Sequence, residues 1–214
     1  MIFVLFIGAF IIGSIPTGLV LAATKGIDLR KVGSGNIGAT NVLRAMGKEA
    51  ALMTLVGDMA KGFIPVLAAR YFFPDTGIQF SALASMPFQI SNTHIAFEGA
   101  IGLAAILGHD FSIFLKFKGG KGVATSLGVA LALSPHAALL AATIWLLTFR
   151  YSGYSSLSAL VAFGAFPFCI SMIDNSAEKI VVACIIAILI FISHRANIQR
   201  LITGSESKFT RKRR

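Results

Sequence analysis

Two glycine-rich loops hold the residues best suited to bind a phosphorylated ligand. The first is GSGNIGATN, from Gly33 to Asn41, in which hydroxyl and amide side chains lie among glycines and which Arg44 follows closely. The second is KFKGGKG, from Lys116 to Gly122, in which three lysines surround three glycines. Glycine exposes backbone N–H groups and lets a ligand approach the main chain, and a nearby lysine or helix N-terminus adds positive potential. Both loops therefore predict contact with phosphate oxygens.

The candidate residues of these loops are neutral donors in the first and cations in the second. The first loop offers Gly33, Ser34, Asn36, Thr40, Asn41 and Arg44, and the second offers Lys116, Gly119, Gly120, Lys121 and Gly122, with His109 shortly before it. Two alternative interpretations stay open. The first loop could be a turn in which Ser34 or Asn41 caps a helix, and the lysines of the second could be ordinary basic residues of a membrane-protein loop.

A third group of polar residues follows the last apolar run of the chain. His194, Asn197 and Arg200 recur at intervals of three, so on one helix they share a face and could form one wall of a site. Glu206, a few residues later, is expected to pair with a loop arginine in a structural role.

Asp58 and Lys61 form a further pair, three residues apart inside an apolar run. Ionisable groups within a membrane span are costly and are usually paired or functional. Two interpretations of this pair stay open: a structural ion pair that packs two helices, or direct contact with a ligand.

Several familiar catalytic and metal-binding patterns are missing from the sequence. Lys121 is followed by Gly122 and preceded at position 115 by a leucine, so the second loop is not a nucleotide-hydrolysing P-loop. No GxSxG elbow occurs. Cys169 and Cys184 form no ligand spacing, so we expect no metal site and no cofactor.

The composition identifies the solvent that surrounds the chain. Hydrophobic residues make up 56% of the 214 residues and charged residues only 13%, with a mean hydropathy of +0.80, so the polar surface is too small for a soluble globule. We expect an all-α, polytopic integral membrane bundle of seven transmembrane helices, with six as the alternative. The expected spans are Ile2–Thr24, Ala50–Phe73, Phe88–Leu107, Val123–Leu133, Pro135–Phe149, Tyr154–Ile173 and Ile180–Ser193.

Basic residues predict how these spans are oriented. With the N-terminus outside, 16 of the 19 Lys and Arg residues fall in cytoplasmic segments, and both glycine-rich loops face the cytoplasm. We expect one membrane-embedded domain over residues 1–206 and a basic cytoplasmic tail over residues 207–214. The net charge of +10 then reflects topology and attraction to anionic lipid, and nucleic acid is not an expected partner. The first span is expected to be retained, since it lacks the features of a cleaved signal peptide.

Five separated motifs, in order, resemble those of the bacterial membrane acylphosphate:glycerol-3-phosphate acyltransferase family. They are GSIPTG in the first span, GSGNIGATN with Arg44, DMAKG from Asp58 to Gly62, GHDFSIFLKFKGGKGVATSLG, and HRANIQRLITGSE. The resemblance implies a seven-helix inner-membrane enzyme that moves a fatty acyl group from acyl phosphate to the 1-position hydroxyl of glycerol 3-phosphate. The products are lysophosphatidate, used in phospholipid biosynthesis, and phosphate.

The resemblance assigns Ser34 and Arg44 to the first catalytic motif, Gly119, Gly120 and Gly122 with Lys116 and Lys121 to glycerol phosphate binding, His194 with Asn197 to the third motif, and Glu206 to a structural role. Together with the other candidate residues of these segments, this gives the full set of expected site residues. The catalytic set is Ser34, Arg44, His194 and Asn197; the substrate-binding set is Gly33, Asn36, Thr40, Asn41, Lys61, His109, Lys116, Gly119, Gly120, Lys121, Gly122, Ser156 and Arg200; and Asp58 and Glu206 are structural. Ser156 lies in FRYSGYSSLSAL, where the sequence departs from the family's compact form, as it also does in the long stretch between the second and third spans.

Two other functions are compatible with basic, glycine-rich loops in a helical bundle. A transporter of phosphorylated solutes would also need them, but the sequence shows no internal repeat, and the candidate residues all lie on one side of the membrane. A lipid-binding scaffold would not need His194, Arg44 and Lys121 together. Membrane lipid is an expected partner, and docking of a soluble acyl-phosphate-forming enzyme on the inner face is left open.

Overall fold

A computed structural model shows an all-helical chain over the residues that it describes, 2–73 and 92–209. The helices are α1 (Ile2–Ser14), α2 (Thr17–Ala23), α3 (Ala39–Met46), α4 (Lys48–Phe72), α5 (Thr93–Asp110), α6 (Val123–Leu133), α7 (Pro135–Ser152), α8 (Ser155–Ile173), α9 (Ala177–Ser193) and α10 (Arg195–Ile202), with short 3-10 turns at Leu29–Lys31 and Ile113–Leu115. The all-α prediction is confirmed for this part of the chain. The long stretch between the second and third predicted spans falls mostly on 74–91, outside the described residues.

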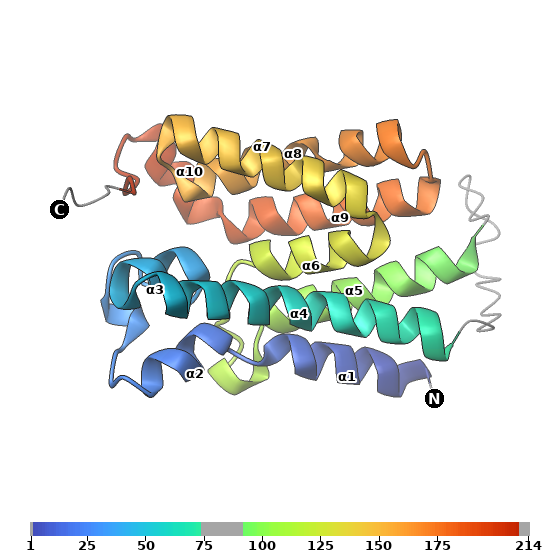
Figure 1. Ribbon diagram of the computed structural model, residues 1–214, viewed down its shortest axis with the longest axis horizontal. Helices are drawn as coiled ribbons and strands as arrows, with labels where there is room; N and C mark the ends of the chain where they lie inside the picture. The colour runs from blue at the N-terminus through green and yellow to red at the C-terminus, as the bar shows by residue number, and fades with distance from the viewer. Residues whose placement is uncertain (1, 74–91, 210–214) are drawn as a thin grey trace.

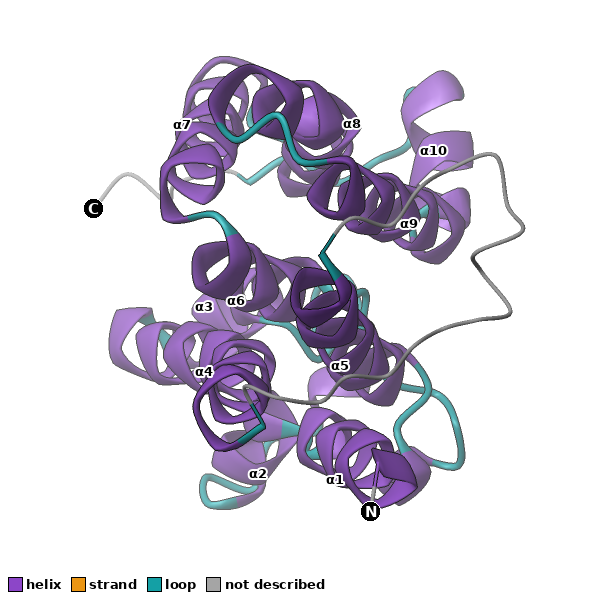
Figure 2. Ribbon diagram, turned by 90° about the vertical axis from the view of Figure 1, so that its right-hand side faces the viewer, coloured by secondary structure: helices purple, strands orange, loops and turns teal. Residues whose placement is uncertain are grey.

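The long helices run side by side in two groups, with α6 between them. Figures 1 and 2 show α1, α4 and α5 on one side of α6 and α7, α8 and α9 on the other. Helix α6 packs against α4, α5, α7 and α9, so it joins the two groups. The main core forms around it, with Val129, Ala130 and Leu133 of α6 packed among buried residues such as Val66, Phe166 and Ile186.

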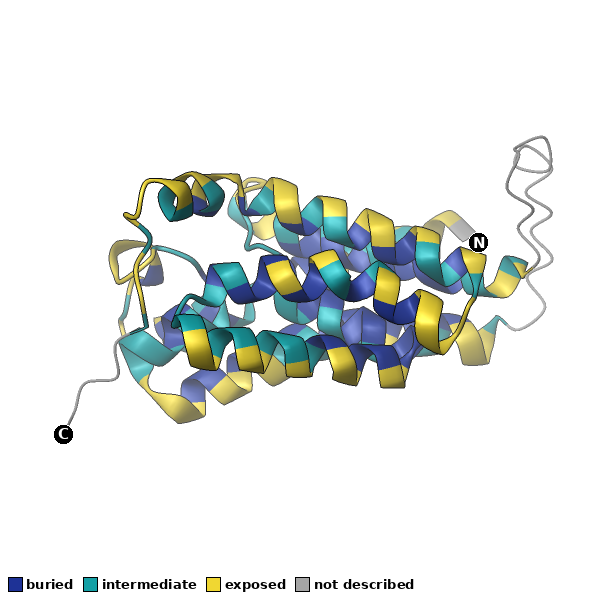
Figure 3. Cartoon of the chain, turned by 90° about the horizontal axis from the view of Figure 1, so that it is seen from above, coloured by how far each residue is buried: buried dark blue, intermediate teal, exposed yellow. Residues whose placement is uncertain are grey.

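The outer faces of the helices are apolar and exposed, which suits lipid and not water. Figure 3 shows exposed residues repeating along the helices that form the outside of the bundle. Large side chains there are far from buried: Phe168 is 66% exposed, Met172 69% and Ile64 57%. An apolar surface of this extent marks contact with a membrane or a partner.

Three helical segments are long and apolar enough to cross a bilayer: Lys48–Phe72, Thr93–Leu115 and Ser155–Ile173. Two bent pairs, α1 with α2 and α9 with α10, raise the number to five within the described residues. The 11 residues of α6 span about 16 Å, against roughly 30 Å of hydrocarbon, so α6 cannot cross alone. Its junction with α7 at Ser134-Pro135 is a hairpin turn (Figure 1). Seven spans therefore stay a prediction.

The first predicted span, Ile2–Thr24, is broken into two helices at Pro16. Helices α1 and α2 meet at an angle of 41° around Ile15 and Pro16, because proline lacks an N–H group and disfavours helix in the residue before it. The carbonyl groups freed by the break are satisfied by buried side chains from other helices. Lys61 Nζ donates to Ile15 O at 3.0 Å, and Ser112 Oγ donates to Ser14 O at 2.6 Å.

Close contact between α4 and α6 depends on a glycine in each helix. A Cβ atom on Gly62 would overlap the carbonyl of Thr125, and one on Gly128 would overlap the carbonyl of Met59. Small residues allow backbones to approach in this way within membranes. Because α6 begins directly after the second glycine-rich loop, this contact also fixes where that loop lies.

We expect Gly128→Ala to push α6 away from α4 and lower the Tm of the detergent-purified protein by about 2 to 10 °C, the range for an overpacked core. Differential scanning fluorimetry measures the change. Gly8→Ala in α1 is the matched control, since a Cβ there meets nothing within 4 Å. An unchanged Tm for Gly128→Ala would show that the helices separate without cost.

Candidate active site

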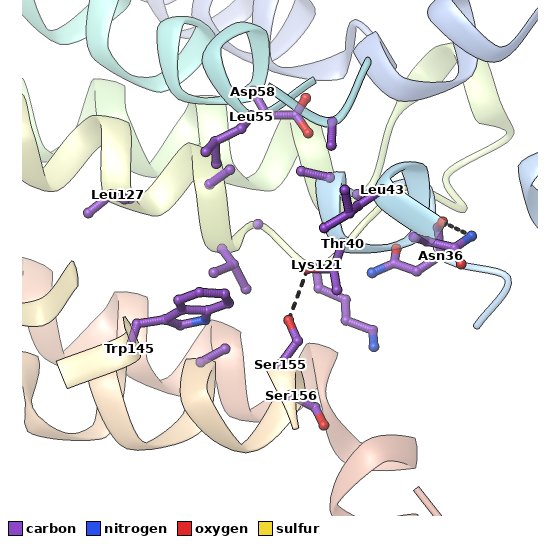
Figure 4. A pocket seen from close by; sticks show the side chains of 18 of the residues that line it. Asn36, Thr40, Leu43, Leu55, Asp58, Lys121, Leu127, Trp145, Ser155 and Ser156 are labelled. Carbon is purple, nitrogen blue, oxygen red and sulfur yellow. Dashed lines mark hydrogen bonds between the residues drawn. The ribbon is translucent and has the colours of Figure 1, made fainter. Parts of the chain in front are cut away.

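A cavity of about 570 Å³ opens at the end of the bundle that holds both glycine-rich loops. One end is polar and includes Ser34, Asn36, Lys121, Asn197 and Glu206. The rest is an apolar arm between α4, α6, α7 and α8, lined by Leu52, Leu55, Val123, Leu127, Ala141, Trp145, Leu146, Ala159 and Phe163. Figure 4 shows Lys121, Asn36 and Ser156 toward one end and Leu127 and Trp145 toward the other. The cavity thus offers one place for charged groups and one for a hydrocarbon chain.

Asn41 holds the first glycine-rich loop in its shape. Its amide nitrogen donates to the carbonyls of Leu29, Val32 and Asn36 at 2.8–3.0 Å, and its Oδ1 accepts the Ser34 N–H at 3.0 Å. Only 2% of Asn41 is exposed, so its side chain acts as the loop's internal scaffold. The loop then presents Ser34, half-buried Asn36 and, one turn into α3, Arg44 to the cavity.

The second glycine-rich loop lies directly on the end of α5. Gly119 N and Gly120 N donate to the carbonyls of Asp110 and His109, each at 3.0 Å. A Cβ atom on Gly120 would overlap the His109 ring, and one on Gly119 would overlap the His109 carbonyl. Only glycine fits there, and the close contact directs the following residue, Lys121, into the cavity.

The third polar group lies at a bend of 63° between α9 and α10, not on one continuous helix. His194 is the residue at the bend and is buried, with 3% exposed. Its Nδ1 lies 2.8 Å from Ile190 O. Because a carbonyl oxygen can only accept, Nδ1 carries the proton, and in the neutral ring Nε2 is the free acceptor.

A charged network joins the second loop to the third group. Lys121 Nζ donates to Asn197 Oδ1, and Asn197 Nδ2 donates to Glu206 at 2.6 Å. Ser156 Oγ and Arg200 Nε also donate to Glu206, at 2.6 and 2.7 Å. Both ends of the Asn197 amide are therefore fixed. The arginine partner of Glu206 is Arg200 of α10, and not the loop arginine that was expected.

Charge within this network is tuned by burial and by hydrogen bonds. Burial lowers the pKa of Lys121 to about 8, with Glu206 opposing this change and Arg200 adding to it. Burial acts to raise the pKa of Glu206, but hydrogen bonds from Ser156, Arg200 and Asn197 outweigh it and hold that pKa below its ordinary value. Near pH 7 the network contains a carboxylate and an ammonium whose charge is easily lost.

Comparison with known proteins assigns this architecture to a family. The family of glycerol-3-phosphate acyltransferases matches residues 3–204. The glycerol-3-phosphate acyltransferase of Geotalea daltonii is 46% identical over 97% of both chains, and that of Neisseria gonorrhoeae is 44% identical over 96% of both. The chain belongs to the glycerol-3-phosphate acyltransferase family.

Solved structures agree with this assignment. The crystal structure of PlsY (YgiH), an integral membrane glycerol 3-phosphate acyltransferase, in its glycerol 3-phosphate form superposes with a TM-score of 0.84 at 39% identity, over 98% of this chain and 96% of that one. Its lysophosphatidic acid form superposes with a TM-score of 0.83 at 38% identity. The family and the integral membrane character predicted from the motifs are confirmed, and the transporter alternative finds no support.

The acyltransferase cavity brings together most of the predicted site residues. Its lining includes Ser34, Asn36, Thr40, Asn41, Arg44, Asp58, His109, Lys121, Gly122, Ser156, His194, Asn197 and Glu206. Gly33, Lys61, Lys116, Gly119, Gly120 and Arg200 do not line it. Lys116 is exposed and has a left-handed backbone with φ 52°. Gly119 and Gly120 pack on α5 and so position Lys121, and Arg200 binds Glu206.

Asp58 and Lys61 of the acyltransferase form a buried ion pair, with 2.9 Å between Lys61 Nζ and Asp58 Oδ1. Both are at most 5% exposed. Asp58 reaches the cavity wall, but the ammonium of Lys61 is directed to Ile15 O at the helix break. This geometry fits the structural interpretation of the pair better than ligand contact by Lys61.

Sequence reasoning missed the apolar arm and two polar residues of the acyltransferase cavity. Ser155 Oγ lies 3.0 Å from Thr40 Oγ1 and joins α8 to α3, as Figure 4 shows. Ser207 lines the cavity from beyond α10. The chain's one tryptophan, Trp145, did not reveal the arm, since an aromatic residue in a predicted span can line a cavity as readily as it faces lipid.

Proposed function

We propose that this acyltransferase transfers a fatty acyl group from acyl phosphate to the 1-position hydroxyl of glycerol 3-phosphate, releasing lysophosphatidate and inorganic phosphate. The observation that carries the proposal is the continuity of the cavity, in which a cationic, hydrogen-bonding end leads directly into an apolar arm. An acyl phosphate has this same shape, with a charged head and a long hydrocarbon chain. Glycerol 3-phosphate is small and charged, and it fits the polar end alone.

Lys121 is the group best placed to bind the phosphate of glycerol 3-phosphate. It enters the cavity from the loop beneath α6, whose N-terminal dipole adds to its positive potential. Ser156 and Arg200 donate to Glu206, which is joined to Lys121 through Asn197. Further hydrogen-bond donors therefore lie near Lys121. An ammonium suits this task because it is a compact cation.

Ser34 and Arg44 reach the cavity from other elements, the first glycine-rich loop and α3. A guanidinium binds phosphate oxygens in a fixed, bidentate geometry. We therefore assign Arg44 and Ser34 to the phosphate of the acyl donor. The acyl chain lies in the apolar arm, between Leu127 of α6 and Trp145 of α7.

The reaction needs no covalent enzyme intermediate, because acyl phosphate already carries a good leaving group. The hydroxyl oxygen of glycerol 3-phosphate attacks the acyl carbonyl carbon, a C–O ester bond forms, and the C–O bond to phosphate breaks. His194 Nε2 accepts a hydrogen bond from the attacking hydroxyl and orients it, while the departing phosphate takes up the proton. We assign the second N–H of the Asn197 amide, the one not donated to Glu206, to the charge that develops on the carbonyl oxygen.

The proposed topology places this chemistry on the cytoplasmic side of the bacterial inner membrane. It has seven spans, with the N-terminus outside and the basic tail inside. Support comes from the basic residues, which gather at the end of the molecule that carries the loops and the cavity. Lysophosphatidate formed there enters the inner leaflet, where phospholipid biosynthesis would use it.

The choice of donor is tested by supplying palmitoyl phosphate and palmitoyl-CoA separately to the detergent-purified protein with glycerol 3-phosphate. We expect lysophosphatidate only from palmitoyl phosphate. Equal or greater turnover with palmitoyl-CoA would contradict the proposed donor, while leaving membership of the acyltransferase family intact.

The lowered pKa of Lys121 predicts how activity depends on pH. Lys121 is protonated below its pKa of about 8 and loses its charge as the pH rises through that value, so phosphate binding weakens on the alkaline side. We expect kcat/KM for glycerol 3-phosphate to fall about tenfold per unit above pH 8. Lys121→Arg, which stays charged, should lose this alkaline limb. If kcat/KM of Lys121→Arg still falls above pH 8, the titration of another group causes the fall.

A further inference from the structure

The segment after α10 turns back over the mouth of the cavity. We call residues Ser205–Phe209 the C-terminal strap. It is fastened to the turn between α7 and α8, where Phe209 N donates to Gly153 O at 2.8 Å and Lys208 Nζ lies 5.2 Å from the centre of the Tyr154 ring. Ser207 of the strap lines the cavity. The family match ends at residue 204, and Ser207–Phe209 of the strap follow the last of the sequence motifs.

The strap contacts Arg44 in two ways. The guanidinium carbon of Arg44 lies 5.8 Å from the centre of the Phe209 ring, and Arg44 Nη2 donates to Ser207 O at 3.4 Å. No carboxylate forms an ion pair with Arg44 within residues 2–73 and 92–209. The guanidinium is therefore held by an aromatic face and a carbonyl group, which leaves its charge available for an anion.

Phe209 is itself supported by aromatic rings that lead to the apolar arm. The ring centres of Phe209 and Phe149 are 5.6 Å apart, and Phe149 stacks on Trp145 with 5.0 Å between centres and 20° between planes. Trp145 lines the arm. A row of three rings thus runs from the wall of the arm to Arg44.

We propose that Phe209 is a positioning residue for Arg44, and that the C-terminal strap completes the binding site for the phosphate of the acyl donor. The ring fixes the plane of the guanidinium, so that its donors are directed into the cavity. The inference rests on the proposed function, because Arg44 is assigned there to the donor phosphate. It adds a residue to the site that none of the sequence motifs contains.

The first test compares strap variants in steady-state assays with palmitoyl phosphate and glycerol 3-phosphate. We expect Phe209→Ala to lower kcat/KM for palmitoyl phosphate about three- to thirtyfold, the range for losing a cation–π contact, and to leave KM for glycerol 3-phosphate unchanged. Phe209→Tyr should restore activity, since it keeps the aromatic face. Phe168→Ala is the matched control, because Phe168 is an exposed phenylalanine of α8 that does not line the cavity.

Phe209→Leu separates positioning from packing. Leucine retains an apolar side chain against Phe149 but has no aromatic face for Arg44, so it should fold and still show most of the loss. Activity of Phe209→Leu equal to that of the unmodified protein would overturn the proposal. An equal rise in KM for both substrates would also overturn it, since a general structural defect would affect both.

A double-mutant cycle decides whether Phe209 acts through Arg44. In an Arg44→Ala background, Phe209→Ala should cause no further loss in kcat/KM for palmitoyl phosphate. The same fold-loss in both backgrounds would contradict the positioning role. If Arg44→Ala alone leaves donor kinetics unchanged, the assignment of Arg44 in the proposed function fails, and that result is distinct from failure of the strap.

Discussion

Replacing His194 with Ala is expected to reduce kcat about 100- to 1,000-fold, with the KM values of both substrates changed little. His194 is buried at the bend between α9 and α10, and its Nδ1–H is committed to Ile190 O. The ring is therefore held in a fixed orientation, which in the proposed mechanism presents Nε2 to the attacking hydroxyl. Phosphate release at saturating substrate measures the effect.

His194→Gln is the informative companion variant, because a side-chain amide can still accept a hydrogen bond while being a far weaker base. Partial recovery of kcat in His194→Gln would indicate that orientation of the hydroxyl is the main contribution. If His194→Ala retained full turnover, the residue would have no place in the reaction.

Replacing Lys121 with Ala should have its main effect on binding. We expect KM for glycerol 3-phosphate to rise about 10- to 100-fold, the range for removing one charge-assisted contact, with a smaller fall in kcat at saturation. The loop geometry supports this expectation, since Gly119 and Gly120 pack on α5 and direct Lys121 into the cavity.

Lys116→Ala is the matched control for Lys121→Ala, because Lys116 belongs to the same loop but is exposed and does not line the cavity. It should leave KM for glycerol 3-phosphate within about twofold of the unmodified value, as exposed charges contribute little. A fall in kcat with an unchanged KM for Lys121→Ala would contradict the binding role.

The helices and the polar end of the site could be predicted from sequence because both depend on local patterns. Apolar runs placed α6 correctly at Val123–Leu133. The glycine-rich loops indicated Ser34 and Lys121, and the polar group after the last apolar run indicated Asn197. Pro16 marked in the sequence a place where the first span could break, but it did not indicate which side chain would satisfy the carbonyl groups freed there. Lys61 then proved to satisfy the carbonyl that this break exposes.

The apolar arm and the strap could not be predicted because they depend on contacts between distant segments. Nothing local to Trp145 says whether it faces lipid or a cavity, since both surroundings are apolar. Likewise, the contact of Phe209 with Arg44 joins residues that lie far apart in the sequence. The partner of Glu206 was wrongly expected in a loop, because the bend after α9 brings Arg200 of α10 to it instead.

The most direct test of the account is to incubate the purified protein in detergent with palmitoyl phosphate and glycerol 3-phosphate and measure both products. No CoA and no other protein are added. The account predicts that phosphate and 1-palmitoyl lysophosphatidate appear in equal amounts, and only when both substrates are present. Phosphate release without glycerol 3-phosphate, or no release from protein shown to be folded, would contradict the claim that this cavity carries the acyl transfer.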